Sequence, residues 1–225
     1  MVKYIFFLAV SVAFGQKVNK ATYEIILNKP EKTTKVKNIR AQLLIEDAKN
    51  VEYEMLFNLV ESYYFEKEVL KNDFEKGINL TKVLAGNNNK YYTSYGKEQN
   101  CFYLNETEGD NLFVSYKKVV WKLLQESKKI GDLLCYKAET LNINKSKKFR
   151  PTVAWYAPEI PYSFGPNKYH GLPGLIVQLN NNTLTYNLKK IEFSISDKIK
   201  KPKKGKRITE EEFLKEFYKK YSDKK

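Results

Sequence analysis

The sequence predicts a mainly β fold: a single curved antiparallel sheet, half-barrel-like, with a C-terminal helix. Apolar and polar residues alternate with a period of two along several segments, as in strands with one face on a core and the other in water. The chain also contains 17 tyrosines and 13 phenylalanines, and aromatic side chains favour the pleated, half-buried surface of a sheet. The strand-like segments follow one another closely, which favours a meander of roughly eight to twelve strands.

The alternation is clearest in three segments. Their apolar positions are Tyr23, Ile25 and Leu27, then Val51, Tyr53, Met55 and Phe57, and finally Ile191, Phe193 and Ile195. Further β-rich runs occupy residues 90–95, 112–116, 119–124, 133–141 and 152–157. Residues 77–89 end in one glycine and three asparagines, which is typical of a connecting loop.

Near the C-terminus the pattern becomes that of a helix. Thr209 and Glu212 have the spacing of a capping box, in which each side chain binds the other residue's backbone N–H. Phe213, Phe217 and Tyr221 follow at intervals of four residues and therefore share one helix face. We expect this aromatic stripe to dock the helix on the sheet, which would curve around the helix or around an apolar groove; a free helix that binds a partner is the alternative.

The N-terminus has the layout of a cleaved secretory signal peptide. Lys3 supplies a positive charge, residues 4–14 are apolar, and Ala13 and Gly15 place small residues before a cut ahead of Gln16. The run is too short to span a bilayer, and no later segment approaches about 18 apolar residues, so we expect no transmembrane segment. The sequence thus divides into a signal peptide (1–15), an antiparallel β domain (16–197) and a basic linker with the C-terminal helix (198–225), in a periplasmic or secreted protein.

The positive charge is concentrated in the C-terminal part. The formal net charge is +14, and residues 198–225, with 12 basic and 5 acidic side chains, contribute +7 of it. Such a run is most often a solvated linker. Contact with an anionic envelope surface or an acidic partner is the alternative. Nucleic acid is not expected, because an exported chain seldom meets it and no recognition module is visible.

Cys101 and Cys135 are the only two cysteines. In an exported protein such a pair is a disulfide candidate. Both also lie among strand-like hydrophobic residues, where a buried thiol acts as a small apolar group, so the alternatives stay open. A metal site is not expected, because the chain has no C-x-x-C motif and His170 is its only histidine. We expect no cofactor.

A series of motifs carries a family resemblance. It begins with the stretch from Trp121 to Ala138 and continues with the short motifs Ala154-Trp155-Tyr156-Ala157, Glu159-Ile160-Pro161, Gly165-Pro166 and Gly171-Leu172-Pro173-Gly174-Leu175-Ile176. In this order and spacing the motifs closely resemble the GLPGLI family of exported proteins, named after the last hexapeptide. The resemblance is strong over about residues 120–180. One departure is Lys148-Phe149-Arg150-Pro151, where the family commonly has a Gly-Arg pair.

The resemblance implies location and fold but no reaction, because the family has no assigned activity. It implies an exported one-sheet protein, distantly similar to the half-barrels that carry or sense lipoproteins in the periplasm. Glycine and proline in the structural motif (Gly165, Pro166 and Gly171–Ile176) indicate a shaped turn packed on the sheet. That turn is either architectural or a contact surface.

Enzymatic chemistry is not expected, and no catalytic residue is assigned. His170 could act as a base, but a solvent-facing loop histidine is the more common role. Cys135 with His170 would make a thiol nucleophile and its base, yet nothing indicates an electropositive pocket around the thiol. Glu159 has no obvious partner for acid–base work. A hydrolase-type enzyme is therefore the least favoured reading.

A binding or carrier module for an apolar or peptide-like ligand is favoured. Aromatic side chains on rigid loops make good anchors, and the candidate ligand-binding residues are Trp155, Tyr156, Tyr162, Phe164 and Tyr169. These rings could instead simply fill one end of the core. A docking accessory of an outer-membrane receptor or transporter is the alternative function. A concave pocket would support ligand binding, and a flat exposed strand edge would support docking.

Overall fold

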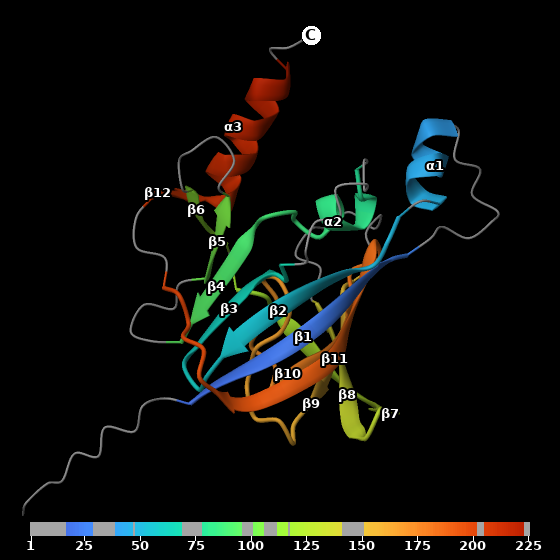
Figure 1. Cartoon of the computed structure of the whole chain (residues 1–225), viewed down its shortest axis with the longest axis vertical. Coiled ribbons are helices and arrows are strands. Elements are labelled where there is room, and N and C mark those ends of the chain that lie inside the picture. Colours follow the sequence, from blue (N-terminus) through green and yellow to red (C-terminus); the bar gives the residue numbers. More distant parts are fainter. Residues whose placement is uncertain are drawn as a thin grey trace, which may run out of the picture.

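The computed structural model of the chain describes residues 17–28, 39–46, 48–68, 78–95, 101–105, 112–116, 118–140, 151–201 and 205–222. Within these ranges, twelve strands form a single sheet, accompanied by three helices (Figure 1). The strands are β1 (Val18–Leu27), β2 (Val51–Phe57), β3 (Glu61–Glu66), β4 (Lys90–Ser94), β5 (Cys101–Asn105), β6 (Leu112–Ser115), β7 (Trp121–Ile130), β8 (Leu133–Thr140), β9 (Val153–Ala157), β10 (Leu175–Asn180), β11 (Leu184–Ile195) and β12 (Lys206–Thr209). The helices are α1 (Ile39–Glu46), α2 (Leu80–Leu84) and α3 (Glu210–Ser222).

Two antiparallel meanders make up most of the sheet. The strands run in the order β12-β6-β5-β4-β3-β2-β1-β11-β10-β9-β8-β7, so β1 to β6 form one meander and β7 to β11 the other. They join where β11 pairs antiparallel with β1. The sheet is curved and open (Figure 1). The prediction of a mainly β, curved antiparallel fold with a C-terminal helix is therefore confirmed, with β12 as an exception because it lies parallel to β6.

The expected alternation is confirmed in β1 and β2 but is wrong for part of β11. Tyr23 and Tyr53, which lie opposite each other, are fully buried. Phe193, expected on an apolar face, is 57% exposed. The end of β11 is irregular: Ser194 has φ 57°, and the pairing with β1 shifts register there. The core instead takes Tyr186 from the first half of β11.

Buried tyrosines occupy the centre of the core. The rings of Tyr53 and Tyr64 stack with centroids 5.2 Å apart, and Tyr64 meets the edge of Tyr91 at 6.0 Å and that of Tyr23 at 6.3 Å. A buried phenol hydroxyl needs a hydrogen-bond partner. Tyr23 donates to the Ile176 carbonyl at 2.7 Å, where a register shift in β10 leaves the ladder between β9 and β10 irregular.

The loop between β9 and β10 packs into the core. Its residues Phe164 and Leu172 are each 1% exposed. A Cβ on Gly165 would lie 2.5 Å from the Ile176 side chain, and a Cβ on Gly174, whose φ is +153°, would lie 2.3 Å from the Ala157 carbonyl oxygen. The two glycines thus allow the loop to lie directly against β9 and β10. The sheet packs around this loop, whereas we had expected it to curve around the C-terminal helix or around an apolar groove.

Three side chains from distant strands hold the loop and strand β10, which follows it. Each of the three donates a hydrogen bond to a backbone carbonyl group there. Tyr95, just after β4, donates to the Ser163 carbonyl at 2.7 Å, and Trp121 on β7 donates to the His170 carbonyl at 2.9 Å. Together with the bond from Tyr23, these contacts tie both halves of the sheet to the motif segment. The motif is therefore part of the architecture of the core.

The C-terminal segment returns to the sheet before its helix begins. Lys201 forms an ion pair at 3.2 Å with the largely buried Glu61, and residues 206–209 then pair with β6 as β12. The expected basic linker thus includes an edge strand. The capping box is confirmed: the Thr209 N–H donates to Glu212 Oε2 at 2.7 Å and the Glu212 N–H donates to Thr209 Oγ1 at 3.2 Å.

Helix α3 does not lie over the sheet as expected. It starts at the sheet edge and projects away from it (Figure 1). Phe213 is half-buried, and the side chains of Phe217 and Tyr221 lie outside the described residues. The prediction of docking through an aromatic stripe is wrong because the helix continues directly from β12, at the edge of the sheet.

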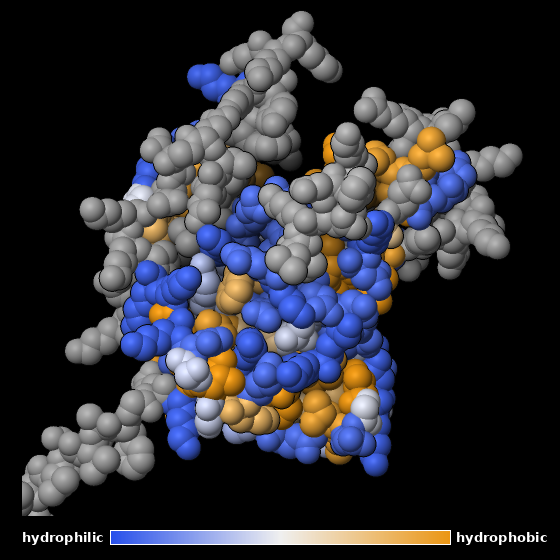
Figure 2. Space-filling view, viewed as in Figure 1, coloured by the Kyte–Doolittle hydropathy of each residue, from blue (hydrophilic) through white to orange (hydrophobic). Residues whose placement is uncertain are grey.

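Two short helices, α1 and α2, were not predicted. Helix α2 lies inside the segment expected to be a loop, and Asn79 caps it by accepting from the Thr81 N–H at 3.0 Å. On α1, Leu43 is 53% exposed, and Figure 2 shows hydrophobic surface over that helix. No helix in the described ranges has the length and apolar character needed to cross a bilayer. The predicted signal peptide lies outside the described residues.

Candidate functional site

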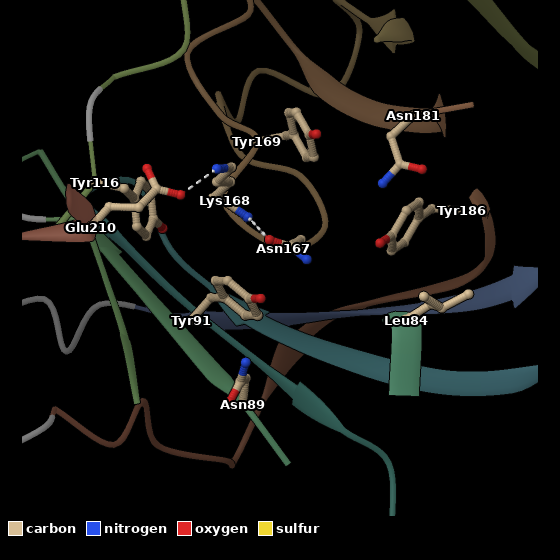
Figure 3. A pocket seen from close by; sticks show the side chains of 10 residues that line it. All are labelled: Leu84, Asn89, Tyr91, Tyr116, Asn167, Lys168, Tyr169, Asn181, Tyr186 and Glu210. Atoms are coloured by element: carbon tan, nitrogen blue, oxygen red, sulfur yellow. Dashed lines mark hydrogen bonds and ion pairs between the residues drawn. The ribbon is translucent and has the colours of Figure 1, made fainter. Parts of the chain in front are cut away.

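A pocket of about 280 Å³ lies at the end of the sheet that carries α2 and α3. Its wall comes from both meanders, from the loop between β9 and β10, and from the start of α3 (Figure 3). Four tyrosines line it, Tyr91, Tyr116, Tyr169 and Tyr186, together with Asn89, Asn167 and Asn181. Leu84, Lys168 and Glu210 complete the lining. We call this site the tyrosine–asparagine pocket.

Tyr186 is the most deeply buried of the four tyrosines that line the pocket. Its side chain is fully buried, and its hydroxyl lacks a hydrogen-bond partner of good geometry among the described residues. Burial raises the pKa of Tyr186. The amides of Asn167 and Asn181 lie close enough to its oxygen to oppose this rise, although neither completes a full hydrogen bond. A buried hydroxyl without any partner costs about 1–3 kcal/mol, and the two amides offset part of this cost at Tyr186.

Two of the asparagines direct N–H groups toward the pocket because their carbonyl oxygens are already bound. Asn167, at φ 58°, accepts the Lys168 N–H at 2.7 Å. Asn181 accepts the Thr183 N–H at 3.2 Å and the Leu184 N–H at 2.8 Å. These turn bonds fix each amide group with its nitrogen directed toward the interior (Figure 3). This end of the pocket therefore offers mainly donors.

The opposite end of the pocket carries charge. Lys168 Nζ and Glu210 Oε1 are 2.9 Å apart, and Lys168 Nζ also lies 5.9 Å from the ring centroid of Tyr116. The two charged side chains are 36% and 39% exposed. Water therefore screens the pair, and separating it costs little.

The five predicted ligand-binding rings do not converge on one cavity. Tyr169 alone lines the pocket. Phe164 is buried 4.9 Å from Tyr95, and Tyr162 packs edge-on against Phe57 at 4.9 Å. Trp155 and Tyr156 are neighbours in β9 and point to opposite faces of the sheet.

Their contacts differ accordingly. Lys128 Nζ lies 4.3 Å from the Trp155 ring, whereas Tyr156 is buried beside Tyr136 with ring centroids 6.2 Å apart. Tyr156, Tyr162 and Phe164 thus serve packing, which was the alternative reading of this cluster.

His170 is not the solvent-facing histidine that we expected. It is 4% exposed, and its Nδ1 lies 3.0 Å from the Tyr95 hydroxyl. Burial, with a further contribution from Lys118, lowers the pKa of His170 to about 4, so the ring is neutral at pH 7. The loop is packed inside the sheet, which explains why its histidine is buried.

Cys135 is a free, buried thiol, so the disulfide considered from the sequence is not formed. Cys101 begins β5, and seven strands separate β5 from β8 in the sheet order. Burial raises the pKa of Cys135 to about 11, which makes the thiol a poor nucleophile. Glu159 is exposed on the loop after β9. In the described parts of the chain, no cluster of histidine, cysteine and acidic residues could hold a metal ion.

Sequence reasoning missed most of the pocket. Tyr91, Tyr186 and Asn181 lie in segments without a conspicuous motif, and only the fold brings them together. A local signal did exist at Asn167 and at Asn181, since asparagine in a turn binds its own backbone and tolerates positive φ. Nothing in the sequence indicated that Glu210 would reach Lys168.

Comparisons with known proteins give a family match and a fold match. A protein-family model described as "Protein of unknown function (Porph_ging)" matches residues 141–178. The structure is similar to PNGF-II in its P21 and C2 crystal forms, with TM-scores of 0.57 and 0.52 and 12% identity in each case. The alignments cover 90% and 89% of this chain but only 34% and 32% of PNGF-II.

The similarity to PNGF-II shows the fold alone, and this chain spans about one third of that protein. A LolA superfamily protein, NE2245 from Nitrosomonas europaea, matches with a TM-score of 0.29 and 9% identity over 80% of this chain and 87% of that one. No curated protein matches the sequence.

Proposed function

We propose that this chain is an exported, non-enzymatic binding or carrier module that holds a small ligand in the tyrosine–asparagine pocket. The observation that carries the proposal is the Tyr186 hydroxyl, which is fully buried without a full partner on a side chain that lines a pocket of about 280 Å³. A ligand that accepts a hydrogen bond there would remove an energetic cost that the free protein bears.

Binding fits the chemistry of the pocket better than catalysis does. Burial raises the pKa of Tyr91 to about 12 and also raises that of Tyr186, so both phenols stay protonated at neutral pH. Protonated phenols and asparagine amides position a ligand by hydrogen bonds and exchange few protons with it.

The lining favours a peptide-like ligand over a purely apolar one. Of the ten lining residues, Leu84 is the only aliphatic one. The tyrosine rings offer apolar faces, and the amides and hydroxyls offer hydrogen bonds. A peptide has both kinds of surface, whereas an apolar chain would leave these polar groups without partners.

Docking through a strand edge is the weaker alternative. Strand β7 is the edge next to β8, and it carries Lys122, Lys128 and Lys129. Its pairing with β8 also shifts register between Leu123 and Ser127. Lysines and bulges hinder the addition of a further strand to an exposed edge. These features favour the pocket as the functional site.

The sequence pattern supports export and a family assignment. Residues 1–15 have the layout of a signal peptide. The matched region 141–178 contains the hexapeptide Gly171–Ile176, which supports membership of the GLPGLI family. Mass spectrometry of the protein from its native host should find Gln16 at the N-terminus, and retention of Met1 would contradict export by this route.

The binding proposal is tested by native purification followed by mass spectrometry of small molecules released on unfolding. Asn89→Trp places a large ring in the pocket and should abolish the released ligand. Asn88→Trp is the matched control, because Asn88 is the exposed neighbour in the same turn. Equal amounts of ligand from both variants would contradict a role for the pocket.

A further inference from the structure

The two ends of the tyrosine–asparagine pocket select different parts of a ligand. Figure 3 shows Lys168 and Glu210 near Tyr116 at one end, and Asn181 with Tyr186 at the other. The first end binds through charge and the second through neutral hydrogen-bond donors. A ligand that fills the pocket therefore needs two different groups.

The neutral end requires an acceptor from the ligand. The carbonyl oxygens of Asn167 and Asn181 are bound to backbone N–H groups, so their NH₂ groups are the donors of this end. Both amides lie close to the Tyr186 oxygen, and each NH₂ group has a second N–H for a ligand. The Tyr186 hydroxyl is a further donor without a full partner. An amide carbonyl accepts two such bonds and donates none. A sugar hydroxyl fits less well, because its own proton would find few free acceptors here.

The charged end already holds a carboxylate. Glu210 Oε1 lies 2.9 Å from Lys168 Nζ, so the protein itself shows which group this lysine binds. Both side chains are more than one-third exposed, and Glu210 belongs to the first turn of α3, outside the sheet. A ligand carboxylate can replace Glu210 at little cost, because an exposed ion pair is only weakly stabilising.

Building on the function proposed above, we propose that the pocket binds a small amide carboxylate, the chemistry of an N-acyl amino acid or of a peptide C-terminus. Its carboxylate replaces Glu210 on Lys168, and its amide carbonyl accepts from Tyr186 and Asn181. A volume of about 280 Å³ suits one or two amino-acid residues, since pockets for larger small molecules span roughly 300–1,000 Å³.

Ligand-observed NMR and calorimetry on the full mature chain test this assignment. The probes are a panel of N-acetyl amino acids, the matching C-terminal carboxamides, tripeptides with a free C-terminus, acetate and methyl glucoside. We expect the acids to bind at least about tenfold more tightly than the carboxamides, and more weakly as ionic strength rises. Tripeptides that outbind the acetylated residues would identify a peptide C-terminus as the source, and the reverse result would identify free acyl amino acids.

Three variants separate the charge effect from general damage. Lys168→Met should weaken binding of the acids about tenfold and leave the carboxamides unchanged. Glu210→Gln should tighten binding of the acids about twofold to fivefold, because it removes the competing carboxylate. Glu211→Gln is the control: Glu211 pairs with Lys215 on the surface of α3 and should have no effect.

The failures of the two proposals are distinguishable. Equal affinity for acids and carboxamides, or unchanged affinity in Lys168→Met, would overturn the contact between a ligand carboxylate and Lys168. Stronger binding of acetate or methyl glucoside than of the N-acetyl acids would overturn the assignment of an amide carboxylate. Binding in the pocket would stand in each case. If no probe binds and the Asn89→Trp variant releases the same molecules as Asn88→Trp, the binding function itself is wrong.

Discussion

Replacing Tyr186 by phenylalanine should leave the protein at least as stable as the wild type, and this result would be unusual for a buried tyrosine. Tyr186 and Tyr23 are both fully buried. The Tyr23 hydroxyl donates to the Ile176 carbonyl at 2.7 Å, whereas the Tyr186 hydroxyl lacks a full partner among the described residues. Tyr23→Phe is therefore a matched control that removes the same atom from a satisfied site.

The expected magnitudes differ in sign. Tyr23→Phe removes a hydrogen bond and leaves the Ile176 carbonyl without its partner, a loss of about 1–2 kcal/mol in the free energy of unfolding. Tyr186→Phe removes a hydroxyl that was stripped of water without full compensation, so the free energy of unfolding should stay constant or rise by up to about 1 kcal/mol. Partial bonds from Asn167 and Asn181 keep this gain small.

Urea unfolding of the two variants and the wild type measures these differences, provided that the slopes with denaturant agree. The ligand binding of Tyr186→Phe is measured alongside and should be weaker. A loss of stability in Tyr186→Phe as large as that in Tyr23→Phe would show that the Tyr186 hydroxyl is already satisfied in the folded protein. The reasoning that makes it available to a ligand would then be refuted.

Three further predictions concern the core and the loop. Gly174→Ala should lower the free energy of unfolding by more than about 2 kcal/mol, because its Cβ would meet the Ala157 carbonyl. Gly171→Ala, at φ +92° and with its Cβ at an ordinary contact distance of 3.6 Å from the Lys118 side chain, should cost about 1 kcal/mol. Similar urea midpoints for the two variants would contradict this. The pKa of His170 is lowered to about 4 from 6.5, so its contribution to stability is complete above pH 6.5 and is lost as the pH falls through 4. His170→Gln should therefore flatten the pH dependence of the free energy of unfolding over this range by up to about 3 kcal/mol. An unchanged pH profile would show that the histidine is hydrated in the folded protein. Cys135, with a buried thiol of pKa about 11, should react with a thiol reagent only after unfolding, and rapid labelling of the native protein, detected by mass spectrometry, would contradict its burial.

The sheet could be predicted because each strand carries its own signal. The alternation of Tyr23, Ile25 and Leu27 follows from the period of a strand, and it places these residues on the buried face whatever the neighbouring strand is. The capping box at Thr209 is equally local and is present in the structure. Strand β12 and the register of β11 could not be predicted, because they depend on partners distant in the sequence.

The pocket was largely unpredictable for the same reason. Its lining residues lie on two turns, one helix start and strands of both meanders, and no periodicity relates them. The high local number of aromatic residues led to the prediction that Trp155 and Phe164 bind a ligand. Such a cluster does not by itself distinguish a ring that packs in the core from a ring that binds a ligand. Phe164 is buried because the loop folds inward, and this follows from the shape of the whole sheet.

The glycine-rich motif joins the architecture of the core to the proposed site. Gly165 and Gly174 let the loop lie against β9 and β10 at distances that a Cβ would prevent. The residues between them, 167–169, then point into the pocket as an amide, an ammonium group and a phenol. A change at either glycine would displace these three side chains together. Loss of ligand binding in a glycine variant would therefore show that the position of these side chains matters. Loss of binding in Lys168→Met, with normal stability, would show that Lys168 itself contacts the ligand.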